Sequence, residues 1–242
     1  MRTATGAELH WDRVDIQHKL QSLLTAVETS EASTPAKNTR LLGKLRRWRE
    51  QLESILASVA RIREVLAPKL ASLLGVSIQG SELLTTAMFE PSTRNLFLEL
   101  ETQFSHEGGP LSRDAFIDLE SLSDMARVLA LVGDAAISMT VLHHLWRPRV
   151  ADAGLLTQSR AELVSNEHLA WLCDQWGLYD YRIHFDPPSP TKSEISHTKG
   201  TLLEAIYGIV YIEHGLDEVK RLISHLEEHP HTTSTSLDNA SA

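Results

Sequence analysis

The chain is poor in cysteine, glycine, proline and aromatic residues. Of its 242 residues, one is cysteine, 12 are glycine, 9 are proline and 6% are aromatic. A single cysteine excludes an internal disulfide framework, which favours a reducing, cytoplasmic location. Cys173 lies in a helical apolar pattern, so we interpret it as a packing residue and not as a nucleophile.

Long apolar runs and a signal peptide are also lacking. No uninterrupted apolar run approaches the roughly 20 residues that cross a bilayer. The N-terminus, with Glu8, Asp12 and Asp15, lacks the basic-then-apolar plan of a signal peptide. We therefore expect no contact with a membrane. The formal net charge of −9 argues against non-specific coating of nucleic acid, but it allows phosphate contacts through a local basic patch or a bound metal.

What the chain does contain is helix-forming sequence. Leu and Ala dominate, apolar residues recur at three- and four-residue steps, and no alternating pattern typical of β-strands is present. The sequence therefore predicts an all-α fold. We expect residues 1–66 to form an N-terminal helical hairpin or arm, residues 67–229 to form the main domain, and residues 230–242 to be a disordered tail. Pro68, at the boundary, is expected to break or restart the helix.

Two acidic residues lie inside apolar runs of the predicted main domain. Asp134 lies within residues 129–137 and Glu204 within residues 201–210, and neither run contains a basic residue. The helix around Asp134, predicted at residues 126–146, is apolar almost all round and is expected to be central. The helix that contains Glu204 is predicted at residues 199–212. An ionised carboxylate is costly in an apolar interior unless a positive charge meets it. Either each acid lies on a hydrated helix face, or the two meet and share a proton or a hard cation such as Mg²⁺.

Three other patterns allow a functional and a structural interpretation. The basic run 44–49 could touch RNA or could be the solvated face of a helix. His225-Leu226-Glu227-Glu228-His229 matches a zinc-protease pattern, but Pro230 follows directly and no third ligand is apparent, so a solvated helix end is favoured. The adjacent His143 and His144 point to different sides of a helix, which favours a core or dimer-facing role.

Five blocks, in order, then resemble the endonuclease domain of the ribonuclease III family, over roughly two thirds of the chain. They are residues 73–87, Leu131-Val132-Gly133-Asp134-Ala135, the segment 155–167 with Arg160-Ala161 and Ser165-Asn166-Glu167, Lys192-Ser193, and Glu204-Ala205-Ile206-Tyr207-Gly208 followed by Gly215-Leu216. The N-terminal arm has no counterpart in this pattern.

The resemblance implies a fold, an activity and a set of site residues. The fold would be all-α and would dimerise, with a valley across the homodimer for double-stranded or structured RNA. Asp134 and Glu204 would be the catalytic residues and would hold Mg²⁺, or Mn²⁺, that activates water for attack on a phosphodiester. Thr201 would reach the metal through an ordered water. Candidate RNA contacts, clustered before the Glu204 helix, are Lys192, His197 and Lys199.

The sequence departs from the family pattern at the carboxylates. Ala130 and Thr201 replace two of the usual four acids, and Arg127 stands where the family has an acid seven residues before Asp134. Asp124 cannot compensate, because ten residues of helix separate it from Asp134 by about 15 Å. The Mini-ribonuclease III branch lacks the same two acids, although it usually carries an acid where this chain has Ser138.

Two functions from different classes follow. The first is a metal-dependent endoribonuclease of the ribonuclease III type that processes double-stranded or structured RNA. The second is a catalytically impaired member of the fold that binds structured RNA or a ribonucleoprotein as a dimeric scaffold. In a weaker alternative, the N-terminal arm docks a protein partner and the rest of the chain is a dimeric platform.

Overall fold

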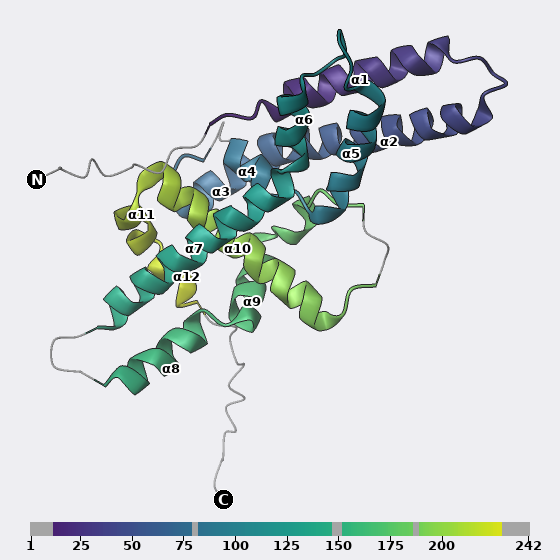
Figure 1. The fold of residues 1–242 in the computed structure, drawn as a ribbon. Helices are drawn as coiled ribbons and strands as arrows, with labels where there is room; N and C mark the ends of the chain where they lie inside the picture. The colour runs from purple at the N-terminus through teal and green to yellow at the C-terminus, as the bar shows by residue number, and fades with distance from the viewer. Residues whose placement is uncertain (1–11, 79–81, 147–151, 186–188, 229–242) are drawn as a thin grey trace, which may run out of the picture.

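Helices make up nearly all of the structure, a computed structural model that describes residues 12–78, 82–146, 152–185 and 189–228 (Figure 1). Within these ranges, the only β-type pairing is one isolated bridge between Phe89 and Ile183, and no strand is present. The predicted all-α fold is therefore confirmed. The expected disordered tail, residues 230–242, lies outside the described residues.

The N-terminal arm is a hairpin of two long helices, α1 (Ile16–Ser33) and α2 (Thr39–Arg61). Asn38 begins α2, and its side chain accepts a hydrogen bond from the backbone N–H of Leu41 at 3.4 Å. The two helices pack along apolar stripes at three- and four-residue spacing. The buried residues of these stripes are Ile16, Leu20, Leu23, Leu24 and Val27 on α1, and Leu45, Trp48, Leu52, Ile55 and Val59 on α2.

Two later helices, α5 (Arg94–Phe104) and α6 (Arg113–Glu120), lie against this hairpin in Figure 1. The ring of Phe104 meets Trp48 edge-on with 6.4 Å between centroids. The ammonium group of Lys19 lies 2.5 Å from the carboxylate of Asp118. Helices α1 and α2 therefore form a hairpin that shares its core with the rest of the chain.

The backbone stays helical through Pro68, with a change in hydrogen bonding. After α2, a π-helical turn η1 (Ile62–Leu66) leads directly into α3 (Ala67–Leu74), in whose first turn Pro68 lies. Proline has no N–H and its ring disfavours the normal helical bond to the preceding turn, so the wider π turn accommodates it. Of the two predicted outcomes, a break or a restart, the structure has the restart.

The remaining elements form the body around two long central helices, α7 (Leu122–Leu145) and α10 (Lys192–His214). Figure 1 shows α10 crossing α7 in the middle of the body, with α9 beside α10 and α8 beside α7. The shorter elements are α4 (Glu82–Ala87), η2 (Pro91–Thr93), α8 (Ala153–Leu163), α9 (Asn166–Trp176), η3 (Tyr179–Tyr181), α11 (Leu216–Arg221) and α12 (Ile223–Leu226).

Local signals fix the ends of the helices beside the site. Ser165 caps α9, as its hydroxyl accepts from the backbone N–H of His168 at 3.2 Å, and Gly177 ends it with φ of 64°. Serine before the first turn and glycine after the last turn are residue types that favour these two ends. At the start of α10, Thr191 and Glu194 form a reciprocal capping box, so α10 begins at Lys192, earlier than the predicted start at residue 199.

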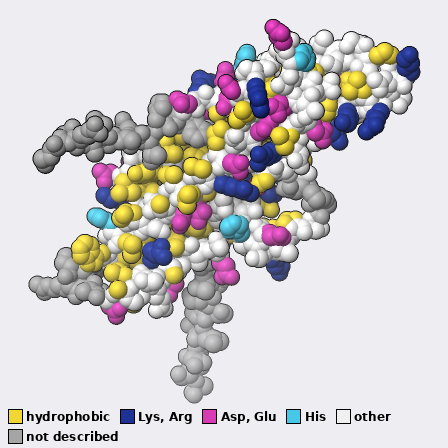
Figure 2. All heavy atoms as spheres, viewed as in Figure 1, with side chains coloured by type: hydrophobic (Ala, Val, Ile, Leu, Met, Phe, Trp, Pro, Cys, Tyr) yellow, Lys and Arg dark blue, Asp and Glu magenta, His cyan; other side chains and the backbone are white. Residues whose placement is uncertain are grey.

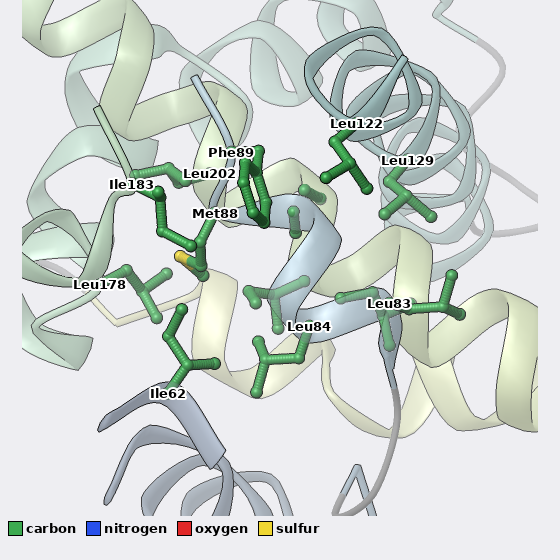
Figure 3. Packing of buried hydrophobic residues seen from close by; sticks show 14 of the residues in the cluster. Ile62, Leu83, Leu84, Met88, Phe89, Leu122, Leu129, Leu178, Ile183 and Leu202 are labelled. Carbon is green, nitrogen blue, oxygen red and sulfur yellow. The ribbon is translucent and has the colours of Figure 1, made fainter. Parts of the chain in front are cut away.

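Buried hydrophobic side chains from α4, α7 and α10 meet those from the base of the arm and the η3 region (Figure 3). The residues labelled there are Ile62, Leu83, Leu84, Met88, Phe89, Leu122, Leu129, Leu178, Ile183 and Leu202. Cys173 belongs to this core and is fully buried, and burial raises the pKa of its thiol to about 12. Its predicted role as a packing residue is confirmed.

Helix α7 is central, as predicted, but it is covered on one side only. Its large apolar residues Val128, Leu131, Met139 and Leu142 are between 39% and 68% exposed. By length and composition α7 is also the one helix among the described residues that could cross a membrane. Its packing against α10 and α4 is that of a core helix, and the absence of membrane contact stays a prediction.

Candidate active site

The centre of the site is the crossing of α7 and α10, where two glycines let the backbones touch. A Cβ atom added to Gly133 would lie 1.8 Å from the carbonyl oxygen of Glu204. One added to Gly208 would lie 2.1 Å from the carbonyl oxygen of Leu129. Any larger residue would force the helices apart. Because Asp134 follows Gly133 and Glu204 itself lies at the contact, the crossing brings the two acids together.

The negative charge of Asp134 affects the protonation of Glu204. Burial, and after it the negative charge of Asp134, raises the pKa of Glu204 from 4.5 to about 7. Asp134 is exposed at the edge of the crossing, whereas Glu204 is half-buried. Within the part of the chain that the structure describes, no lysine or arginine forms an ion pair with either acid. The structure thus joins two acids from distant parts of the sequence and leaves their charge uncompensated.

This donor set fits one hard divalent cation that keeps several waters. Among the described residues, His, Cys, Asp and Glu side chains nowhere gather in a group of three or more that could hold a metal. Ala130 is buried and offers only a methyl group. The hydroxyl of Thr201 donates to the carbonyl oxygen of His197 at 3.0 Å, so its oxygen can still accept a hydrogen bond from water.

The two acids that precede Asp134 have other partners. Asp124 lies 3.7 Å from the guanidinium group of Arg94 and 3.5 Å from that of Arg127. Glu120 is beside Glu101, and burial followed by the Glu101 charge raises its pKa. These contacts agree with the expectation that neither acid replaces the two missing carboxylates.

The three predicted RNA contacts lie along the first half of α10. Lys192 is the exposed first residue of the helix, and His197 is exposed two turns before Glu204. Lys199 lies 2.7 Å from a carboxylate oxygen of Asp174 and 5.1 Å from the ring centroid of Tyr179, with 18% of its side chain exposed. Lys192 and His197 are therefore free to meet a phosphate, whereas the charge of Lys199 is already paired.

Arg160, which belongs to the third block of the resemblance but was given no role there, lies near the residue one turn beyond Asp134. Arg160 of α8 donates to the hydroxyl of Ser138 at 3.0 Å. Ser138 follows Asp134 by four residues, so the two share one face of α7. The position that carries an acid in the Mini-ribonuclease III branch is thus used here to hold an arginine near the site.

The basic run 44–49 on the arm is largely paired with acids of the chain itself. Arg46 and Arg49 contact the two carboxylate oxygens of Glu31 at 3.1 and 2.8 Å. Arg47 and the indole N–H of Trp48 both contact Glu99. These contacts favour the structural interpretation of the run.

Two more of the histidines singled out in the sequence, His144 and His225, have partners in the chain. His144 lies 2.7 Å from Glu227 and His225 lies 3.1 Å from Glu228. His229, the second histidine of the zinc-protease pattern, lies outside the described residues.

Comparison with known proteins assigns this region to a family. Residues 127–215 match the ribonuclease III domain, a range that contains Asp134, Glu204 and the α7–α10 crossing. This match supports a domain of the ribonuclease III family over that range, and the resemblance noted in the sequence is confirmed. The first block of that resemblance, residues 73–87, lies outside the matched range.

The individual proteins that are similar to this chain are named Ribonuclease 3. The chain is 32% identical to Ribonuclease 3 of Mus musculus and of Homo sapiens over 101 residues, 40% of this chain and 7% of each relative. It is 28% identical to Ribonuclease 3 of Lactococcus lactis over 132 residues, 52% of this chain and 54% of the relative. The chain thus spans about half the length of the bacterial relatives and a small part of the mammalian ones.

Proposed function

We propose that the protein is a metal-dependent endoribonuclease that hydrolyses phosphodiester bonds of double-stranded or structured RNA. One observation supports this most: Asp134 and Glu204 are adjacent at a tight helix crossing, and no lysine or arginine among the described residues forms an ion pair with either. A second negative charge beside the half-buried carboxylate of Glu204 is costly, and a divalent cation would remove that cost.

The residues of the site have separate roles in this proposal. Asp134 and Glu204 hold Mg²⁺ or Mn²⁺, which when bound supplies an activated water and stabilises charge on the phosphoryl oxygens. Thr201 accepts a hydrogen bond from a water beside the metal. Lys192 and His197 contact phosphates of the RNA and hold the strand against the crossing, and Lys199 adds a weaker contact.

We further propose that the protein acts as a homodimer through the exposed face of α7. This face is apolar, and together with Leu156 of α8 it lines a cavity of about 420 Å³. Contiguous exposed apolar surface of this kind marks association sites. The residues involved are Val128, Leu131, Met139, Leu142, Trp146, Leu155 and Leu156. Met139→Glu should convert a dimer into monomers in analytical ultracentrifugation, and a monomeric parent would contradict this proposal.

The alternative function is a non-catalytic scaffold that binds structured RNA. The replacement of two expected carboxylates by Ala130 and Thr201 favours it, because a second metal ion would be poorly held. A scaffold would bind duplex RNA in EDTA as in Mg²⁺ and would leave it intact under both conditions.

The experiment is cleavage of end-labelled duplex RNA in Mg²⁺, with and without EDTA, by the parent, Asp134→Asn and Glu204→Gln. We expect cleavage by the parent only with free Mg²⁺, and a loss of more than about 100-fold in both variants. Glu213→Gln, an exposed change on the same helix, is the matched control and should cleave like the parent. Variants that cleave as fast as the parent would contradict the assignment of the site.

A further inference from the structure

The N-terminal halves of α7 and α10 diverge from their crossing and leave a small cleft between them. This cleft has a volume of about 150 Å³, and its wall includes Ser123 and Arg127 from α7 and His197 and Thr201 from α10. Figure 2 shows basic, acidic and histidine side chains gathered over this part of the two helices. The cleft therefore reaches Thr201, about one turn before Glu204 on α10, and is bounded on both sides by nitrogen-bearing side chains.

Arg127 on α7 and His197 on α10 lie at the same sequence distance before the acid of their helix. Arg127 precedes Asp134 by seven residues and His197 precedes Glu204 by seven residues. Seven residues are close to two helical turns, so each lies on the same face as its carboxylate and about 10 Å from it along the axis. A strand that reaches the carboxylates could therefore meet both side chains at a neighbouring position.

The guanidinium group of Arg127 is loosely held and exposed. Its side chain is 65% exposed, and its ion-pair partner is Asp124 at 3.5 Å, which is longer than a good hydrogen bond. Asp124 is shared with Arg94 at 3.7 Å, so two cations divide one carboxylate. The nearby acid of the cleft, Glu90, lies 3.7 Å from Arg182. Arg127 thus keeps positive charge that can act on a ligand.

We infer that Arg127 binds an RNA phosphate next to the one that is cleaved, opposite His197 across the cleft. This inference rests on the proposed function and extends it: a position that carries an acid in the family pattern would here bind substrate directly. An arginine presents several N–H donors in a planar fork that matches phosphate oxygens. The loss of a negative charge near the metal site would thus be accompanied by the gain of a positive charge that binds substrate.

The test measures duplex RNA binding in the Glu204→Gln background with Mg²⁺ present, so that binding is separate from cleavage. Arg127→Ala should weaken binding roughly tenfold and lower the slope of log affinity against log salt by about one. Arg127→Lys should retain most of the affinity, and Arg127→Glu should weaken it further. Arg113→Ala, an exposed arginine at the start of α6, is the matched control and should change neither quantity.

If the role of Arg127 is purely structural, a different result is expected when its ion-pair partner Asp124 is changed. If Arg127 acted only by pairing with Asp124, then Asp124→Asn would weaken RNA binding as Arg127→Ala does. Our inference predicts that Asp124→Asn binds RNA as tightly as the parent background or more tightly. Unchanged affinity and salt slope in Arg127→Ala, while the parent still cleaves duplex RNA, would overturn the inference alone. A parent that neither binds nor cleaves duplex RNA would overturn the proposed function as well.

Discussion

The α7–α10 pair and the α1–α2 pair are both long helix pairs, but their charges are arranged in opposite ways. In the arm, Arg46 and Arg49 meet Glu31, and large apolar side chains separate the backbones. At the α7–α10 crossing, the backbones touch at glycines and two like charges lie together, without an ion pair to any lysine or arginine in the part of the chain that the structure describes. Paired charges stabilise a fold, whereas an uncompensated pair of like charges costs stability and requires another explanation.

The largest effect on stability should come from placing a larger residue at the glycine contact between α7 and α10. Gly133→Ala places a methyl group within 1.8 Å of the Glu204 carbonyl oxygen, so the helices must separate. We expect the free energy of unfolding to fall by at least about 3 kcal/mol. Gly43→Ala in α2, where nothing lies within 4 Å of the added atom, should raise it by about 0.5–1 kcal/mol. Urea unfolding measures both, and equal effects in the two helices would remove the contrast between the pairs.

In the arm, a buried polar contact should affect stability without affecting cleavage. The indole N–H of Trp48 donates to a carboxylate oxygen of Glu99 at 2.7 Å. Trp48→Phe removes this hydrogen bond and some packing volume, and should cost about 2 kcal/mol of unfolding free energy. The cleavage rate per folded molecule should be unchanged. A large loss of rate in folded protein would show that the arm takes part in the reaction.

The pair of like charges, Asp134 and Glu204, should make the stability of the metal-free protein depend on pH. The pKa of Glu204 in the folded chain, about 7, lies above its ordinary value of 4.5. Its contribution to stability is therefore full below about pH 4.5 and is lost as the pH rises through 7. Since Glu204→Gln cannot ionise, we expect it to be more stable than the parent at pH 8 in EDTA by on the order of 1 kcal/mol, after allowance for solvent screening.

The same measurement at pH 5 is the control for this prediction. There Glu204 is largely protonated in the folded chain, so parent and variant should differ little. A parent that is more stable than Glu204→Gln at pH 8 without metal would mean that some group of the chain already neutralises the carboxylate.

The smallest effect is expected for the paired charges of the arm. Glu31→Gln weakens two ion pairs in which Arg46 and Arg49 are 62% and 35% exposed. Such pairs contribute less than about 1 kcal/mol, so urea unfolding should shift only slightly. Cleavage should stay at the rate of the parent.

The sequence predicts much of the fold because the signals involved are local. Apolar spacing predicts α1 and α2, and the Ser165 cap and Gly177 mark both ends of α9. The sequence does not show whether the helix breaks or restarts at Pro68, because a break and a π turn both accommodate a residue without an N–H. The exposed face of α7 was missed for a related reason: an apolar helix has the same pattern whether the chain or another molecule covers it.

The site was predicted only in part. Asp134 and Glu204 stand out in the sequence because a carboxylate in an apolar run is unusual, and the structure places them together, while their catalytic role stays a prediction. The signal for their approach was also present, since Gly133 and Gly208 flank the two acids in sequence, but it was not used. The pairing of Lys199 with Asp174 and of Arg160 with Ser138 could not be predicted, because each joins helices whose relative placement depends on the whole fold.

Direct binding of a divalent cation tests the central claim most closely. Titration of Mn²⁺ followed by electron paramagnetic resonance would compare the parent, Asp134→Asn, Glu204→Gln and the double variant in the absence of RNA. If the two acids share one ion, each single variant should lose most of the binding and the double variant should lose little more. Undiminished Mn²⁺ binding in both single variants would contradict the account.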